Sequence, residues 1–279
     1  MKKKLLKIVL IGRTNAGKSS LLNKIIGETV SISNKKINTT NELIKGIVNF
    51  NNIQIILYDT PGLNFLKTRD NKHKIIKANL WQGIEHSNLI LYLLDSKIIK
   101  LNDLEENLKI LFKLNKKIIL VFNKIDLIEK NKLLPIINQL NEKFTIDSFF
   151  NVSAKYNIGL RDLFKYLKKF AKFQSWEFKD NEITNKDDIF ITNECTRNAI
   201  LTFLHKELPY NIVVTNHIYK ILNNGDIKIK QNIKIANERY KKIILGKNGS
   251  KIKEIRISSQ KQISKILKSK VHLYLEIIK

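Results

Sequence analysis

The sequence of 279 residues has few of the residues on which several classes of protein depend. Its one cysteine, Cys195, excludes a disulfide framework and a cysteine-based metal site, and fits a reducing cytoplasm. Its five histidines form no cluster in the sequence, so we predict no zinc site. No uninterrupted apolar run approaches the roughly 20 residues that a membrane span needs. Residues 2–11 are read as a first strand instead of a signal peptide, and we expect a soluble, cytoplasmic protein.

Positive charge, in contrast, is abundant. The chain contains 51 Lys and Arg residues against 25 Asp and Glu residues, a formal net charge of +26. Such an excess favours a polyanionic partner, either nucleic acid or an acidic membrane surface. Residues 189–279 contain 18 basic and 6 acidic residues, and are about twice as basic per residue as the rest. We expect the polyanion-binding surface there; the alternative is a solvated coat of charge without a target.

Two patterns divide the chain. Apolar runs at residues 5–11, 43–50, 53–58, 89–94, 118–122 and 149–152 alternate with helical spacing at 18–26, 72–85, 101–114, 133–142 and 159–171. This alternation predicts an α/β domain with a mostly parallel, doubly wound sheet over residues 1–171. Residues 172–188 are polar and are expected to form a linker. Residues 189–279 predict an α+β domain, with a helix at 190–207, strands at 211–221 and 226–236, a strand-like run at 243–245, two helical segments and a strand at 271–278.

The motif GRTNAGKS at residues 12–19 lies between the first strand and the first helix. This is the context that the phosphate-binding pattern G-x-x-x-x-G-K-[ST] requires. Its backbone N–H groups are expected to cradle phosphates, Lys18 to reach the β- and γ-phosphates, and Ser19 to ligate Mg²⁺. The alternative is a glycine turn that precedes an ordinary helix and has no role in nucleotide binding. The expected phosphate-binding residues are Gly12, Asn15, Ala16, Gly17, Lys18, Ser19 and Ser20.

Three further motifs, DTPG, NKID and SAK, each follow an expected strand. Asp59 is expected to hold Mg²⁺ through a water, and the Gly62 N–H to approach the γ-phosphate. Asp126 can accept two hydrogen bonds from guanine but not from adenine, which predicts GTP as the ligand. Asn123 is expected to tie its loop to the P-loop. The nucleotide-binding residues in these motifs are Asp59, Thr60, Pro61, Gly62, Asn123, Lys124, Asp126, Ser153, Ala154 and Lys155.

The four motifs in this order resemble the signature of translation-factor-class GTPases, which implies a first switch that contains Thr39 and Thr40. We favour Thr40 as the residue that closes over Mg²⁺. Ras-like GTPases carry glutamine after the switch glycine, whereas this chain has Leu63. In related GTPases an asparagine at the position of Asn15 helps to hold K⁺; the alternative is a capping contact. The expected catalytic residues are Lys18, Asn15, Gly62 and Thr40, and the expected Mg²⁺ ligands are Ser19, Thr40 and Asp59.

The motif GKNG at residues 246–249 is followed by a basic, amphipathic helical segment. This is the KH-domain pattern, in which the loop clamps about four nucleotides of single-stranded nucleic acid. The order helix, strand, strand, helix, helix, strand is that of a type II KH fold. The alternative is that the lysines of this segment form a solvated basic face without a role in RNA binding. The expected RNA contacts are Gly246, Lys247, Asn248, Gly249, Lys251 and Lys253.

Over essentially its whole length the chain resembles the Era family of ribosome-assembly GTPases. The resemblance rests on the motifs above and on residues 37–40, 198–201 and 207–210. It implies GTP hydrolysis to GDP and phosphate, binding to the 3′ end of 16S rRNA, assistance in maturation of the 30S subunit as a GTP-dependent switch, and peripheral association with the inner membrane. We expect a monomer, because no segment resembles a heptad seam.

Two alternatives remain open. Leu63, together with Asn41 in place of the family's usual arginine, is compatible with a nucleotide-gated RNA adaptor that scarcely hydrolyses GTP. A tRNA-modifying GTPase would need a catalytic cysteine near the C-terminus, and residues 271–279 contain none.

Overall fold

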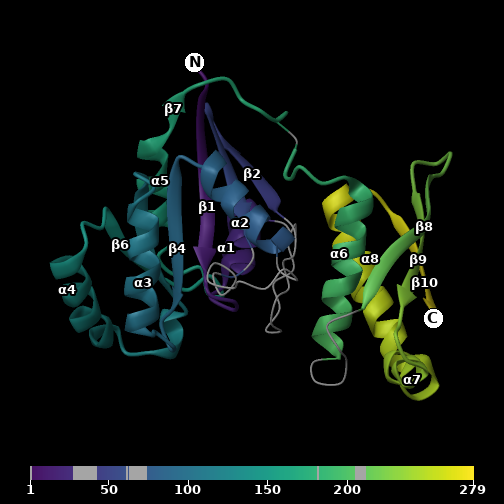
Figure 1. Ribbon diagram of the computed structural model, residues 1–279. Coiled ribbons are helices and arrows are strands. Elements are labelled where there is room, and N and C mark those ends of the chain that lie inside the picture. The colour runs from purple at the N-terminus through teal and green to yellow at the C-terminus, as the bar shows by residue number, and fades with distance from the viewer. Residues whose placement is uncertain (1, 28–42, 61, 63–73, 181, 205–211) are drawn as a thin grey trace. The chain divides into compact units, whose positions relative to one another are not determined.

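The computed structural model describes residues 2–27, 43–60, 62, 74–180, 182–204 and 212–279. The described residues form two compact units, one up to Asn185 and one from Lys186 onward (Figure 1). Several residues singled out from the sequence lie outside the described ranges: Thr39, Thr40, Asn41, Pro61, Leu63 and residues 207–210. No helix in the described part of the chain is long and apolar enough to cross a bilayer.

The first unit is built on a sheet with strand order β2-β3-β1-β4-β5-β6. Its strands are β1 (Lys4–Gly12), β2 (Ile44–Phe50), β3 (Ile53–Asp59), β4 (Leu89–Asp95), β5 (Lys117–Asn123) and β6 (Ser148–Val152). All pairings along this order are parallel except that of β2 with β3. The predicted doubly wound, mostly parallel sheet is therefore confirmed, and each expected strand lies within a residue or two of its expected bounds.

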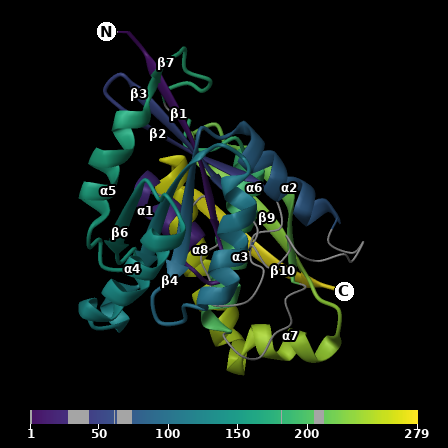
Figure 2. The same cartoon turned by 60° about the vertical axis from the view of Figure 1, so that its left-hand side comes forward.

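Helices cover both faces of this sheet. They are α1 (Lys18–Ile26), α2 (Lys74–His86), α3 (Leu101–Phe112), α4 (Leu134–Lys143) and α5 (Leu160–Leu167), with short 3₁₀ turns η3 (Ile125–Leu127), η4 (Lys130–Leu133) and η5 (Lys168–Phe170). Figure 2 shows α1 and α5 on the opposite side of the sheet from α2 and α3. A hydrophobic core lies on the side of α2 and α3, where Leu80, Leu108 and Leu111 are fully buried against the central strands. Because both sheet faces are covered, the central strands β4 and β5 are almost wholly apolar.

The segment expected to be a linker is in part packed along the first unit. Its start forms β7 (Lys172–Phe173), which pairs antiparallel with the beginning of β1. The buried side chain of Gln54 on β3 accepts hydrogen bonds from the N–H groups of Glu177 (3.0 Å) and Phe178 (3.1 Å) and donates to the Phe178 carbonyl (3.0 Å). We name residues 172–180 and 182–185 the strap. Part of the segment expected to be a linker, residues 172–188, therefore contacts the first unit.

The second unit is a three-stranded sheet covered by helices on one face. Its elements are α6 (Asp188–Phe203), β8 (Val213–Ile221), β9 (Ile227–Lys234), α7 (Glu238–Leu245), α8 (Ser250–Leu267) and β10 (Val271–Ile278). The strand order is β10-β9-β8, with β9 parallel to β10 and antiparallel to β8. The predicted element order is confirmed. Two details were wrong: residues 243–245 end helix α7 instead of forming a strand, and α8 is one helix instead of two segments.

Candidate nucleotide-binding and RNA-binding sites

The loop at residues 12–17 requires glycine at positions 12 and 17, because the backbone there has a positive φ and lies close to neighbouring residues. Gly17 has a φ of +97°, and a Cβ there would lie 2.2 Å from the Asn123 side-chain nitrogen. A Cβ on Gly12 would lie 2.3 Å from the Leu93 carbonyl oxygen. Larger residues would therefore push this loop away from β4 and β5, whose ends it contacts. The loop backbone is held at the carboxyl edge of the sheet, where ligands bind in open α/β folds.

Lys18, the first residue of α1, is folded back over this loop. Its ammonium donates to the carbonyl oxygens of Gly12 and Arg13, both at 3.1 Å. The side chain is 7% exposed, and this burial lowers the pKa of Lys18 to about 8, although the charge of Asp59 acts in the opposite direction. A cation held in this way is stabilised by any anion that enters the loop.

Oxygen atoms from two neighbouring elements meet beside Lys18. The Ser19 hydroxyl donates to a carboxylate oxygen of Asp59 at 2.6 Å, and both residues are buried. Asp59 ends β3, the strand next to β1, so the fold itself brings the two side chains together. A hydroxyl and a carboxylate are hard oxygen donors of the type that Mg²⁺ prefers. The residues present therefore fit a magnesium ion.

Thr60 and Gly62 bring the next loop against the phosphate-binding loop. The Thr60 hydroxyl donates to the Leu10 carbonyl at 2.7 Å, which leaves that side chain occupied within the sheet. A Cβ on Gly62 would lie 2.4 Å from the Thr14 hydroxyl oxygen and 2.9 Å from the Thr14 nitrogen. The backbone of Gly62 can therefore lie this close to the loop only because the residue lacks a side chain.

Asn123 joins three loops at one point. Its side-chain NH₂ donates to the Ala16 carbonyl at 2.8 Å, and its side-chain oxygen accepts from the Ala154 N–H at 3.0 Å. The expected tie to the P-loop is therefore present, and it extends to the loop at residues 153–155. Ser153 is buried, and its backbone pairs with that of Ile158, which shapes the same loop.

The remaining residues of these loops present charge at the surface. The Lys124 ammonium lies 2.5 Å from a carboxylate oxygen of Asp95, at the end of β4. Asp126 and Lys155 are exposed. The pKa of Lys155 is raised, mainly by its contact with Tyr156 and to a smaller extent by Asp126. Sequence reasoning missed Asp95; its signal would have been a carboxylate directly after a buried strand.

In the phosphate loop Asn15 is exposed and Arg13 is partly exposed. Asn15 is exposed with a φ of +66°, and the described residues supply no hydrogen-bond partner for its side chain. The capping contact considered for Asn15 is thus not among the interactions of the described residues. Arg13 pairs with Asp103 of α3 at 3.2 Å, a contact that the sequence analysis did not anticipate.

In the second unit, the loop at residues 246–249 joins α7 to α8. Gly246, Asn248 and Gly249 all have positive φ angles (69°, 51° and 74°), so the loop makes a tight left-handed turn. A Cβ on Gly246 would lie 2.7 Å from a side-chain carbon of Lys251, whereas a Cβ on Gly249 would meet nothing within 4 Å. Lys247 and Lys253 are exposed. No acidic residue lies in the first turn of α8, so this helix start is electrostatically open to phosphate.

Comparison with family models supports the two-part organisation. Residues 7–124 match the model described as 50S ribosome-binding GTPase, and residues 208–279 match the KH-domain model. GTPase Era of Rickettsia typhi is 39% identical over 273 residues, which cover 98% of this chain and 91% of the relative. GTPase Era of Agrobacterium fabrum is 37% identical over 268 residues, which cover 96% of this chain and 84% of the relative.

Solved structures give the same result. A crystal structure of Era in complex with MgGDPNP and nucleotides 1506–1542 of 16S ribosomal RNA has a TM-score of 0.86 and 29% identity, and the match covers 99% of this chain and 93% of that one. A variant of Aquifex aeolicus Era bound to GDP and AlF₄⁻ has a TM-score of 0.86 and 28% identity over the same shares of the chains. The loops described above and the KH fold therefore have a common explanation: the chain belongs to the Era family of GTPases.

Proposed function

We propose that this protein hydrolyses GTP, binds the 3′ end of 16S rRNA through its KH domain, and assists maturation of the 30S subunit as a GTP-dependent switch. One observation carries the proposal. A single chain joins the phosphate loop, the Ser19–Asp59 pair and the guanine-binding loops to a KH loop that is open to phosphate. The similarity to Era crystallised with MgGDPNP and 16S rRNA nucleotides supports the choice of both ligands.

In this proposal residues 12–20 hold the phosphates. The Lys18 ammonium turns from the loop carbonyls toward the β- and γ-phosphates and balances their charge. Ser19 and Asp59 hold Mg²⁺, together with Thr40, which lies outside the described residues. Mg²⁺ supplies charge neutralisation and polarises the phosphate oxygens. Gly62 donates its N–H toward the γ-phosphate, which water attacks in line; no side chain of the described residues is assigned as a general base.

Guanine specificity is assigned to Asp126. Its exposed carboxylate accepts two hydrogen bonds from guanine, while Lys124 lies along the base and residues 153–155 complete the pocket. Asp126→Asn exchanges an acceptor for a donor and is expected to favour xanthine, which carries an extra carbonyl, over guanine. Competition of GTP and xanthosine triphosphate for a fluorescent nucleotide would measure this exchange. Unchanged preference for GTP in the variant would contradict the assignment.

The rate of GTP hydrolysis distinguishes a GTP-dependent switch from a nucleotide-gated RNA adaptor that scarcely hydrolyses GTP. Multiple-turnover phosphate release, measured with and without the 3′ tail of 16S rRNA, is the test. The proposal expects repeated turnover; a single bound GTP that is not consumed would favour the adaptor. A tRNA-modifying enzyme is disfavoured, because the chain's one cysteine, Cys195, is buried within α6.

We assign Asn15 to a K⁺ ion that stands beside the phosphates in place of an arginine finger. Its exposure in the phosphate loop supports this role. Turnover is expected to be faster in K⁺ than in Na⁺, and Asn15→Ala is expected to abolish the difference. Equal rates in the two salts for the unaltered protein would contradict the assignment.

Three further points belong to the proposal. The nucleotide-binding domain is assigned to residues 1–171 and the RNA-binding domain to residues 189–279. The protein is a monomer, which analytical ultracentrifugation tests. It is cytoplasmic and associates peripherally with the inner membrane, which sedimentation with anionic vesicles tests; protein that stays in the supernatant at low salt would contradict membrane association.

A further inference from the structure

The end of the first unit where the parallel strands begin carries a surface that the proposed function does not use. Figure 1 shows β7 and the N-terminus at this end, away from the junction of β1 with α1. Five lysine ammonium groups lie over aromatic rings here. The distances to the ring centres are 4.7 Å for Lys3 over Trp176, 4.7 Å for Lys4 over Phe173, 4.1 Å for Lys168 over Phe50, 5.1 Å for Lys117 over Phe170 and 5.3 Å for Lys169 over Tyr166.

We name these residues, together with Lys172, the lysine–aromatic belt. Its parts come from separate segments of the chain but lie side by side. The Gln174 N–H donates to the Lys3 carbonyl at 3.2 Å, and the Trp176 indole N–H donates to the Lys4 carbonyl at 3.0 Å. Residues 168–171 continue directly into β7, which begins at Lys172, and the Lys4 N–H donates to the Asn52 carbonyl at 2.8 Å, two residues from Phe50.

The charge of the belt is largely uncompensated. Among the described residues, Lys117 is the one belt lysine that pairs with a carboxylate, that of Asp147 at 3.3 Å. The nearby Glu177 carboxylate pairs with Lys7 instead. A ring holds an ammonium in place with about 0.5–1 kcal/mol at exposed sites and leaves its charge available to an anion. Apart from Lys117, the belt lysines therefore present ordered positive charge that is available to bind an anion.

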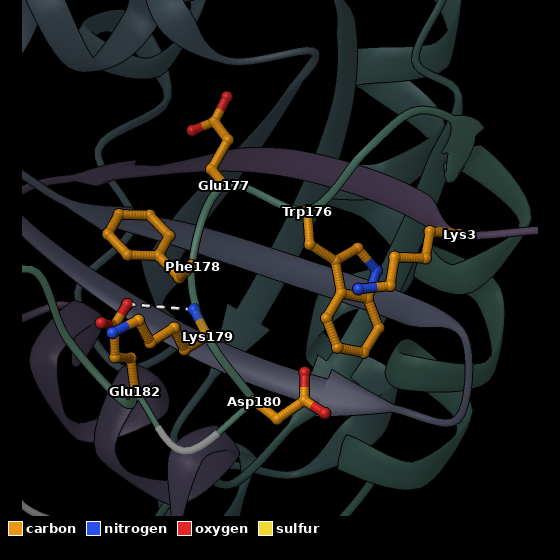
Figure 3. Close-up of a pocket in the computed structure, with 7 residues that line it drawn as sticks. All are labelled: Lys3, Trp176, Glu177, Phe178, Lys179, Asp180 and Glu182. Carbon is orange, nitrogen blue, oxygen red and sulfur yellow. Dashed lines mark hydrogen bonds between the residues drawn. The ribbon is translucent and has the colours of Figure 1, made fainter.

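Acidic residues mark one border of the belt. A shallow hollow of about 560 Å³ lies beside Trp176, and Figure 3 shows the side chains of Asp180 and Glu182 around it. Lys3 and Lys179 also line the hollow, but with Glu177 its carboxylates outnumber these lysines, which disfavours an anionic chain on that side. The favourable path for phosphates runs the other way, from Lys3 across β7 toward Lys168 and Lys169.

The rings indicate which kind of anion fits. Four of the five belt rings are half-buried beneath their lysines, whereas Phe173 is 69% exposed. A membrane-binding surface would present several bare apolar rings to the lipid. A lysine-lined path with one exposed ring instead matches single-stranded nucleic acid, in which phosphates contact lysines and a base stacks on an aromatic ring.

We propose that the lysine–aromatic belt is a second RNA-binding surface, which contacts single-stranded RNA on the GTPase unit independently of the KH loop. Belt lysines contact the phosphates, and Phe173 stacks against an unpaired base. This goes beyond the proposed function, which places RNA on the second unit. An RNA strand long enough to reach both surfaces gains affinity from each.

The test uses the full chain and two single-stranded RNAs that share a KH-binding sequence, one of 10 and one of 40 nucleotides. The belt variant is Lys168→Gln, Lys169→Gln and Lys172→Gln. The control variant removes three exposed lysines elsewhere on the same unit, Lys109→Gln, Lys113→Gln and Lys132→Gln. Anisotropy titrations over a salt series give the affinity and its salt dependence. A second variant, Phe173→Ala, tests stacking without a change of charge.

The belt variant is expected to bind the short RNA as the unaltered protein does, which also shows that it is folded. It is expected to bind the long RNA about tenfold more weakly, with a salt slope reduced by about two. Phe173→Ala is expected to weaken binding of the long RNA several-fold. Equal losses in the belt and control variants would overturn the proposal, as would unchanged long-RNA binding. A belt variant that loses binding to anionic vesicles but keeps its binding to RNA would also overturn the proposal. Failure of the short RNA to bind any form counts against the KH assignment instead.

Discussion

The side-chain NH₂ of Asn123 donates a hydrogen bond to the carbonyl oxygen of Ala16, 107 residues earlier in the chain, at 2.8 Å. The same side chain accepts from the Ala154 N–H, so one amide fixes the phosphate loop and the base loop relative to each other. We predict that Asn123→Ala weakens GTP binding at least tenfold, because two buried backbone groups lose their partner, at about 1–3 kcal/mol each.

Isothermal titration with a non-hydrolysable GTP analogue measures this loss. Asn102→Ala, at an exposed position of α3, is the matched control and is expected to bind normally. An Asn123→Ala protein with normal affinity would mean that the three loops are held together by other contacts.

Gly17 and Gly27 both have positive φ angles (97° and 82°), but only the first is crowded: a Cβ at Gly17 would lie 2.2 Å from Asn123, and one at Gly27 would meet nothing within 4 Å. Gly27→Ala is expected to cost only about 1 kcal/mol of stability, from backbone strain. Gly17→Ala is expected to abolish nucleotide binding as well. Thermal unfolding and nucleotide titration of both variants distinguish the two effects; similar behaviour of the pair would contradict the role of close approach.

The pKa of Lys18, lowered to about 8 by burial, predicts a proton effect of nucleotide binding. A phosphate beside the ammonium raises this pKa, so the bound protein keeps a proton that the free protein loses as pH rises past about 8. Nucleotide affinity is therefore expected to be fully present below this pH and to fall above it.

Titration calorimetry in buffers of different ionisation enthalpy counts the protons taken up. We expect an uptake near zero at pH 7 that approaches about one proton at pH 9. An uptake that does not change between these two pH values would show that Lys18 is not desolvated in the free protein.

Gln54 is expected to hold the strap on the sheet. Gln54→Leu keeps the size of the side chain but leaves the N–H groups of Glu177 and Phe178 without their acceptor. We predict a loss of about 2–4 kcal/mol in unfolding free energy and faster hydrogen exchange in residues 176–178. As the control, Asn185→Ala removes one exposed hydrogen bond between the strap and the sheet, which the Lys45 N–H donates at 2.9 Å, and is expected to cost less than 1 kcal/mol. Equal effects of the two variants would contradict the role of Gln54.

The central sheet was predictable from the sequence because its strands are buried on both faces. Residues 118–122 of β5 are all apolar and all buried, so no polar alternation obscures the strand. The motifs at the strand ends were predictable for a related reason, since each has a fixed spacing that local backbone geometry requires.

The strap and the end of α7 were not predictable in the same way. The strap is polar, and it is fixed by Gln54, more than 120 residues away, so its own composition resembles a linker. The apolar run at residues 243–245 resembles a strand, but Tyr240 and Ile244 lie four residues apart on one helical face, and Asn237 caps the helix through the Arg239 N–H at 3.0 Å. The contacts of the lysine–aromatic belt likewise depend on the tertiary fold.

RNA binding by the full chain, compared between GDP and a non-hydrolysable GTP analogue, tests the central claim most directly. The probe is the 3′ tail of 16S rRNA, the control is a scrambled strand of equal length, and the titration is repeated over a salt series. We predict a preference for the true tail that is stronger with the GTP analogue. Equal, steeply salt-dependent binding of both strands in both nucleotide states would show that the net charge of +26 acts alone, and would contradict a GTP-dependent switch.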